Sequence, residues 1–312
     1  MKKIKIALLL GGDSGEREIS LKTGNKIFEH LDKSKYQIFK YDPKFDLIQF
    51  IKDAERDKFD LVFPALHGPN GEDGKIQGLL ELLKIPFVFS GSLASALAMD
   101  KDKTKIIVAK EGVTVPKSKI VTQKDKITKN ELGYPVIVKP LELGSSVGMT
   151  FAKNLAELKK GVKEALKFDS KVLIEKYIKG RELTVPILEN PKPQALPVIE
   201  IKPKKSQWFD FEAKYTAGAC EEICPAPIPE KVRKKVQNLA LTAYKAMGCK
   251  DLARADFIWD EDKNEFYFLE INTIPGMTDT SLVPQSAQVA GIPFPKLLDI
   301  LIQNTFKKSY NN

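Results

Sequence analysis

Short apolar runs alternate with amphipathic stretches over roughly the first 95 residues. The run at 4–10 is continuously apolar and is closed by Gly11-Gly12, which is typical of a buried parallel strand. Ser14 then precedes apolar residues at helical spacing, so we predict that it caps a helix. Four further segments continue the alternation, three as strands and one as a helix (36–41, 59–66, 86–90 and 76–83). This order predicts a doubly wound α/β domain with a parallel sheet over residues 1–95.

The pattern changes after residue 95, where strands gather around fewer helices. A helix ending at Lys110 leads into an α+β unit that closes near Gly180, which predicts a second domain over 96–180. Its segments are four strands and one helix (118–121, 135–139, 149–153, 172–177 and 155–168). The predicted third domain, 181–312, has four strands, a polar loop and two helices (183–188, 194–201, 254–260, 266–272, 206–227, 229–247 and one from 294).

Composition is that of a globular protein, with 43% hydrophobic and 29% charged residues among 312. A net charge of +9 invites a nucleic-acid partner, but the lysines are scattered among acids as on solvated helix faces. With no basic stripe interleaved with aromatic residues, we expect no nucleic-acid binding. Only five of the 50 cations are arginines, and three of these stand in the candidate motifs below (Arg17, Arg181 and Arg254).

The cysteines and the apolar segments indicate a cytoplasmic protein with no membrane partner. Three cysteines are an odd number, and Cys220-x-x-x-Cys224 lacks the partner pair of a zinc site, so neither a disulfide framework nor zinc is expected. The apolar run at 6–10 is too short for a signal peptide. No apolar stretch approaches the roughly 20 residues that a membrane span needs.

A predicted hairpin carries the strongest chemical signal. Residues 260–265 form a polar turn between two strands, so Asp256 should lie across from Glu270 to within about one residue. Asn272 shares a strand face with Glu270. Two carboxylates and an amide oxygen suit Mg²⁺ with substrate phosphates. The alternative is a solvated strand face that happens to carry three polar residues.

Two other segments suggest a nucleotide. Lys139 ends a strand and is followed by the small-residue loop 144–148, whose backbone N–H groups could approach phosphate oxygens. This is not a Walker A sequence, and an ordinary hairpin turn is the alternative. Glu175 lies in the predicted strand at 172–177, which emerges into a linker. This segment offers backbone groups and an acid for a purine and its ribose, or serves merely as a connector.

Two residues lie where open α/β sheets usually bind ligands. His67 follows a predicted strand at its carboxyl end, and Glu16 stands at the start of the first predicted helix. A histidine in a turn could equally be structural, and an acid there could simply complement the helix dipole.

Taken in order, these motifs resemble the D-alanine–D-alanine ligase family of the ATP-grasp superfamily. The resemblance covers almost the whole chain, and its most specific parts are Leu269-Glu-Ile-Asn-Thr-Ile-Pro-Gly-Met-Thr and Ser281-Leu-Val-Pro. The other matching segments are 11–20, 65–74, 95–101, 138–140, 144–148, 212–215 and 254–256. It implies an N-terminal domain followed by a two-part ATP-grasp fold, with ATP held between the two parts.

The resemblance also implies a reaction in peptidoglycan precursor synthesis. One D-alanine carboxylate attacks the γ-phosphate of ATP and forms an acyl phosphate. The amine of a second D-alanine then displaces phosphate. Charge builds on oxygen in both steps, so positioning and fixed cations should carry catalysis rather than a protein nucleophile.

The residues that match the family motifs acquire expected roles. Those at the reacting groups are Glu16, Ser145, Tyr215, Arg254 and the backbone of Gly276. Those that bind the D-alanine substrates are His67, Ser281 and Leu282. Those that hold or close over ATP are Lys101, Lys139, Ser146, Glu175, Ile178, Glu182 and Lys214. Those that carry two Mg²⁺, with Mn²⁺ as an alternative, are Asp256, Glu270 and Asn272.

Rival functions differ in substrate or in class. A D-alanine–D-lactate ligase would make an ester, but relatives with that preference usually replace the residue at Tyr215. Another ATP-grasp carboxylate–amine ligase is disfavoured by the two specific motifs, and a non-catalytic nucleotide-binding module by the intact Arg254. The resemblance suggests a homodimer. It leaves open the second-substrate range, affinities, monovalent cation activation, the contacts of Arg181, and the effect of Leu143 where some members carry an acid.

Overall fold

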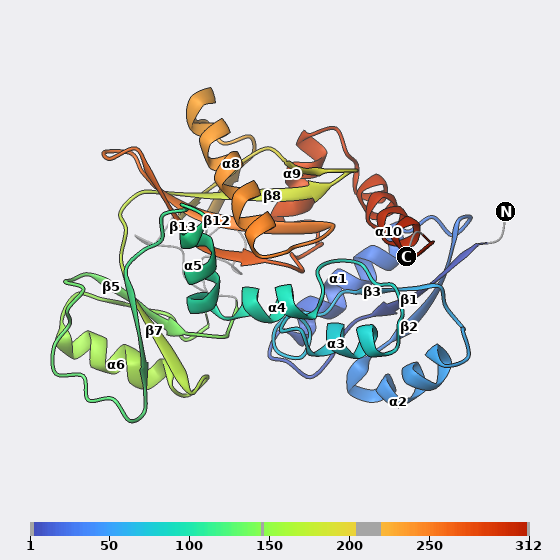
Figure 1. Ribbon diagram of the computed structural model, residues 1–312, viewed down its shortest axis with the longest axis horizontal. Coiled ribbons are helices and arrows are strands. Elements are labelled where there is room, and N and C mark those ends of the chain that lie inside the picture. The colour runs from blue at the N-terminus through green and yellow to red at the C-terminus, as the bar shows by residue number, and fades with distance from the viewer. Residues whose placement is uncertain (1–2, 145–146, 204–219, 311–312) are drawn as a thin grey trace.

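The computed structural model of the chain describes residues 3–144, 147–203 and 220–310 (Figure 1). Its N-terminal unit is built on a parallel sheet of order β2-β1-β3. These strands are β1 (Ile4–Leu9), β2 (Tyr36–Tyr41) and β3 (Leu61–Pro64). Each strand is largely apolar and lies between layers of helices, as parallel strands require.

Helices cover both faces of this sheet, which confirms the predicted doubly wound arrangement. Alternate residues of β1 face opposite layers: Ile6 and Leu8 enter one core, and Ala7 and Leu9 enter the other. The first core contains α1 (Arg17–His30) and α10 (Phe294–Tyr310), and the second contains α2 (Pro43–Ala54) and α3 (Lys75–Leu82). The helix α10, which follows the third unit in sequence, thus packs in the core of the first unit. The domain bounds 1–95, 96–180 and 181–312 remain a prediction.

The central unit is a four-stranded antiparallel sheet of order β4-β7-β5-β6 with α6 (Leu155–Ala165) on one face. Its strands are β4 (Ser118–Thr122), β5 (Val136–Pro140), β6 (Thr150–Ala152) and β7 (Lys171–Lys176). Val138 and Ile174 of the sheet pack against Leu158 and Val162 of α6 in a core of their own. Figure 1 shows this unit standing apart from the N-terminal sheet.

A larger antiparallel sheet of order β11-β10-β8-β12-β13 forms the third unit, with β9 paired to β8. Its strands are β8 (Arg181–Glu189), β9 (Pro193–Ala195), β10 (Ile199–Pro203), β11 (Cys220–Ile223), β12 (Leu252–Asp260) and β13 (Glu265–Asn272). The helices α8 (Glu230–Ala246) and α5 (Lys101–Lys110) share its core. In Figure 1, α5 lies between this sheet and the central one.

Several sequence predictions were wrong in detail. Ser14 does not cap α1: Glu16 is the N-cap residue, and the Ser14 hydroxyl instead donates to the carbonyl of His67. The segment 86–90 makes only an isolated bridge at Phe87, because Phe89 turns the chain with a φ of 79°. The segment 194–201 divides into β9 and β10, and β11 lies within the predicted polar loop. Three helices were not predicted from the sequence: α2, α4 (Ser92–Met99) and α9 (Leu282–Val289).

Membrane-spanning helices are absent from the part of the chain that the structure describes. None of its helices combines the length and the apolar character that crossing a bilayer requires.

Candidate active site

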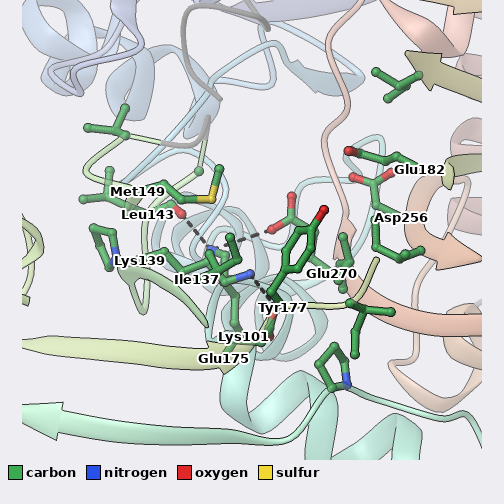
Figure 2. A pocket seen from close by; sticks show the side chains of 18 of the residues that line it. Lys101, Ile137, Lys139, Leu143, Met149, Glu175, Tyr177, Glu182, Asp256 and Glu270 are labelled. Atoms are coloured by element: carbon green, nitrogen blue, oxygen red, sulfur yellow. Dashed lines mark hydrogen bonds and ion pairs between the residues drawn. The ribbon is translucent and has the colours of Figure 1, made fainter. Parts of the chain in front are cut away.

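A cavity between the central sheet and the C-terminal sheet gathers residues from both (Figure 2). Its charged side chains come from α5, β5, β7, β8, β12 and β13, so the approach of the two sheets builds the site. Nine residues expected from the sequence line it: Lys101, Lys139, Glu175, Ile178, Glu182, Arg254, Asp256, Glu270 and Leu282.

The hairpin of β12 and β13 sets its carboxylates opposite each other. Asp256 pairs with Glu270, and the hairpin ends with Asp260 paired to Glu265, as the sequence predicted. Thr184 of β8 is the neighbour of Asp256 on its other side, and its hydroxyl donates to the carboxylate. Sequence reasoning missed Thr184, because the pairing of β8 with β12 joins segments about 70 residues apart.

Arg254 and Asp256 form a two-point ion pair within β12. The guanidinium donates from Nε to Oδ1 at 2.9 Å and from Nη2 to Oδ2 at 2.8 Å. Burial lowers the pKa of Arg254, but Asp256, together with Glu270 and Glu72, outweighs burial and raises that pKa further above its usual range. Arg254 is therefore a permanent cation whose plane is fixed by a carboxylate at the edge of the cavity.

The hairpin supplies the donor set that a divalent cation would use. Asp256 and Glu270 line the cavity, and Asn272 lies two residues beyond Glu270. The Asn272 side-chain oxygen accepts a hydrogen bond from the N–H of Ile274. Among the described residues no group of three or more His, Cys, Asp and Glu side chains could hold a metal. The predicted set has two carboxylates and one amide oxygen, all hard donors, which fits the chemistry of Mg²⁺.

Two lysines bring ammonium groups to the opposite wall (Figure 2). Lys101 begins α5, and its Nζ donates to the carbonyl of Leu143 at 2.6 Å and lies 3.9 Å from Glu270 Oε2. Lys139 on β5 donates to Glu175 Oε1 at 3.2 Å. Burial lowers the pKa of Lys139 to about 8, against the effect of Glu270, which raises it. Both cations can therefore exchange their protein acceptors for phosphate oxygens.

A third lysine, Lys105, was not among the expected site residues. It lies one turn after Lys101 on α5, is only 3% exposed, and forms an ion pair with Glu175 Oε2. Burial, followed by the charges of Lys139 and Lys101, lowers its pKa well below the ordinary value. The spacing of four residues from Lys101 was a usable signal, because such residues share a helix face.

Apolar side chains complete the cavity beside Glu175. Ile137, Met149, Tyr177 and Leu269 line it with the expected Ile178. Glu182 enters from the start of β8. An apolar stretch of lining that also carries the carboxylates of Glu175 and Glu182 suits a purine and a ribose.

Glu16 and His67 lie at the carboxyl ends of the N-terminal strands, outside this lining. A Cβ built at Gly144 would lie 3.5 Å from a Glu16 carboxylate oxygen, so the loop after β5 reaches the first helix. His67 is 4% exposed, with Nε2 3.0 Å from Thr23 Oγ1 and Nδ1 3.1 Å from Glu72 Oε1. Both ring nitrogens thus have protein partners, which favours a role in positioning the Glu16 region.

The segment after β13 turns back onto the start of α9. Ser281 is the N-cap residue of α9, and its Oγ accepts a hydrogen bond from the N–H of Thr278 at 3.0 Å. A Cβ at Gly276 would lie 2.9 Å from Ser281 Oγ, so glycine permits this close approach. Leu282 begins the helix at the edge of the cavity, where free backbone N–H groups favour an anion.

Four expected site residues, Ser145, Ser146, Lys214 and Tyr215, lie outside the described residues. The structure gives the contacts of the other two arginines in the sequence motifs. Arg17 forms a two-point pair with Asp42, and Arg181 forms one with Glu200. Neither of them lines the cavity that Arg254 lines.

A cavity between two antiparallel α+β units, with buried cations facing paired carboxylates, is the arrangement expected of an ATP-grasp ligase. The protein-family model described as "D-ala D-ala ligase C-terminus" matches residues 106–303. A second family model, described as "D-ala D-ala ligase N-terminus", matches residues 40–90. The chain belongs to the D-alanine–D-alanine ligase family.

Individual relatives match over nearly their full length. The D-alanine–D-alanine ligases of Pelotomaculum thermopropionicum and Syntrophobacter fumaroxidans are 44% and 45% identical, covering 96% and 97% of both chains. The D-alanine–D-alanine ligase from Bacillus anthracis, complexed with ATP, is 35% identical with a TM-score of 0.85 over 99% of each chain. The VanG D-Ala:D-Ser ligase from Enterococcus faecalis is 32% identical with a TM-score of 0.83, covering 97% of this chain and 100% of VanG.

The pKa of Lys139 predicts a pH dependence of nucleotide binding. Lys139 is protonated below about pH 8 in the free protein and neutral above it. Since phosphate oxygens bind the ammonium form, the dissociation constant of ATP should rise as pH increases through this value, by up to about tenfold per pH unit. Lys139→Arg, which stays charged, should abolish that rise. Equilibrium binding across this range tests the assignment, and an unchanged profile in the arginine variant contradicts it.

Proposed function

We propose that this chain joins two molecules of D-alanine into D-alanyl-D-alanine, with conversion of ATP to ADP and phosphate, for peptidoglycan precursor synthesis. The observation that carries the proposal is the cavity itself, which sets Lys101 and Lys139 against Asp256 and Glu270. Family membership supports it, because relatives named D-alanine–D-alanine ligase match over the full chain.

The first step joins a D-alanine carboxylate oxygen to the γ-phosphorus of ATP and breaks the bond to the bridging oxygen of ADP. Glu16 binds the ammonium group of this D-alanine, and the helix start that carries Glu16 is held by Ser14 and His67. Lys101 and Lys139 bind the phosphates, while Glu175, Ile178 and Glu182 hold the adenine and ribose. Their fixed charges offset the charge that spreads over the transferring phosphoryl oxygens.

In the second step, the amine of another D-alanine attacks the acyl phosphate carbon, and phosphate leaves with the bonding electrons while the amine loses a proton. Arg254 and the backbone N–H of Gly276 stabilise the oxyanion that forms on the carbonyl oxygen. Ser281 and the N-terminus of α9 at Leu282 bind the carboxylate of this second substrate. As the family resemblance implies, the segments that carry Ser145, Ser146, Lys214 and Tyr215 close over the site, and Ser145 and Tyr215 help to orient Glu16.

Asp256, Glu270 and Asn272 would hold two Mg²⁺ ions. When bound, these ions supply positive charge that neutralises the phosphates. Asp256 would serve both the metal and Arg254, since the guanidinium takes one edge of its carboxylate and Thr184 donates to Oδ1. This shared role ties the orientation of Arg254 to the metal site.

A cytoplasmic location and a homodimer complete the proposal, as the sequence resemblance implies. Leu82 and Leu93, which are 82% and 72% exposed near the contact of α3 with α4, support an apolar contact between copies.

Phosphate release with product identification tests the function. With ATP and Mg²⁺, D-alanine should release phosphate and give a product with the mass of the dipeptide. L-alanine alone should give none, and D-alanine with D-lactate should give little ester. Absence of phosphate release with D-alanine would contradict the proposal. A predominant ester or a D-alanyl-D-serine product would instead identify one of the rival ligase activities.

Arg254→Lys tests the oxyanion role. Lysine offers a point charge in place of a planar fork, so kcat should fall by about 100-fold or more while ATP binding changes little. Arg233→Lys is the matched control and should keep full activity, because this arginine of α8 forms an ion pair with Glu230 and does not line the cavity. Near-normal turnover of Arg254→Lys counts against the role.

Asp256→Asn tests the metal site through ATP binding rather than turnover. The Mg²⁺ concentration needed for half-maximal ATP binding should rise at least about tenfold, because a ligand loses its charge. Asp260→Asn, on the same strand but paired with Lys263, should leave it unchanged. An unaltered Mg²⁺ requirement in the Asp256 variant would remove this residue from the metal site.

A further inference from the structure

We propose that Lys105 is a positioning residue of the nucleotide site, which keeps the Glu175 carboxylate ionised and oriented toward the adenine amino group. The inference rests on the proposed function, because it takes ATP as the substrate and Glu175 as the residue that meets its base. It adds a residue that is set behind the cavity wall rather than in it.

The two oxygens of Glu175 are divided between two lysines. Oε1 accepts from Lys139 at 3.2 Å, and Oε2 faces Lys105. The Glu175 side chain is 4% exposed and that of Lys105 is 3% exposed. Lys139 and Glu175 line the cavity, whereas Lys105 is absent from the lining. The inner partner of Glu175 is thus Lys105, and the outer partner is Lys139.

The two lysine partners of Glu175 are expected to respond differently when ATP binds. Lys139 faces the cavity and is expected to turn to the phosphates, which takes it away from Glu175. A buried carboxylate that loses its cation partner is strongly destabilised in its ionised form and tends to take up a proton. Lys105 cannot follow Lys139, because it sits behind Glu175 on α5. Burial and the neighbouring charges of Lys139 and Lys101 oppose protonation of Lys105 in the free protein. When those two lysines pair with phosphates, their repulsion of Lys105 falls, and Lys105 supplies the countercharge that remains with Glu175 in the complex.

The charge on Glu175 decides which base it accepts. The amino group at C6 of adenine donates hydrogen bonds, and guanine presents an acceptor oxygen at that position. An ionised carboxylate accepts only, so it binds the adenine amine and repels the guanine oxygen. A protonated Glu175 would lose this discrimination. Lys105 acts on nucleotide selection through Glu175, without touching the nucleotide.

Lys105→Met tests this through two nucleotides that differ at one group. Purine riboside triphosphate is ATP without the amino group. The variant should raise the dissociation constant of ATP at least about tenfold, as expected for a charge-assisted hydrogen bond, and change that of purine riboside triphosphate less than about twofold. Lys103→Met, on the same helix with its side chain 58% exposed, should change neither. Equal losses for both nucleotides, or no loss for ATP, would overturn the proposal.

A double variant keeps the test decisive if Lys105→Met does not fold. Glu175→Gln alone leaves Lys105 without its partner carboxylate, and Lys105→Gln with Glu175→Gln replaces the ion pair by two amides. The double variant should have a higher Tm than Glu175→Gln, and its preference for ATP over purine riboside triphosphate should be reduced from that of the unmodified protein. Equal Tm values for single and double variants, or an undiminished preference, would show that Lys105 does not act through Glu175.

The unmodified protein separates this proposal from the function it rests on. If it binds ATP and prefers it over purine riboside triphosphate but releases no phosphate with D-alanine, the ligase assignment fails and the role of Lys105 is still decided by the variants. If it releases phosphate with D-alanine and Lys105→Met lowers both affinities equally, the ligase assignment stands and the role of Lys105 fails.

Discussion

The site depends on three ammonium groups buried within reach of one another. Lys101 and Lys139 line the cavity, Lys105 lies behind its wall, and Glu175 and Glu270 are the acids set against them. Burial lowers the pKa of Lys105 and of Lys139, and the charges of neighbouring lysines lower both further, so this cluster is tolerated only with carboxylates in place. A polyanion such as ATP relieves the same repulsion. The free protein is therefore poised to exchange internal acceptors for phosphate oxygens.

The three motif arginines differ from the lysines of the site, because each is paired with a carboxylate through two hydrogen bonds. Arg17, Arg181 and Arg254 each make a two-point pair with a carboxylate, which a lysine cannot reproduce. Two of these pairs hold the fold together, and only Arg254 faces the cavity. Arginine, the rare cation, stands where a planar guanidinium is needed to bind both oxygens of a carboxylate. Lysine, the common cation of this chain, lies mostly at the surface but also supplies the charges of the site that can change partner.

Local patterns predicted most of the elements, although α2, α4 and α9 were missed, and long-range pairing accounts for the site contacts that they did not predict. The hairpin register from Asp256 to Glu270 follows from a short turn, and the faces of β1 follow from alternation. The contact of Thr184 with Asp256 and that of Lys105 with Glu175 join distant segments, so no local spacing specifies them. Motif resemblance supplied most of the candidate site, because it encodes such long-range contacts without deriving them.

The position of α5 explains how nucleotide and amino-acid sites can act together. Its first residue, Lys101, donates to the carbonyl of Leu143 and approaches Glu270 of the metal-site hairpin. The next residue of that loop, Gly144, lies against Glu16 at the start of α1. One lysine therefore connects the phosphate wall, the hairpin and the loop that borders the expected first-substrate site. When Lys101 turns to a phosphate, the loop loses a hydrogen-bond donor. Under the proposed function, the position of this loop relative to Glu16 is therefore coupled to the binding of ATP.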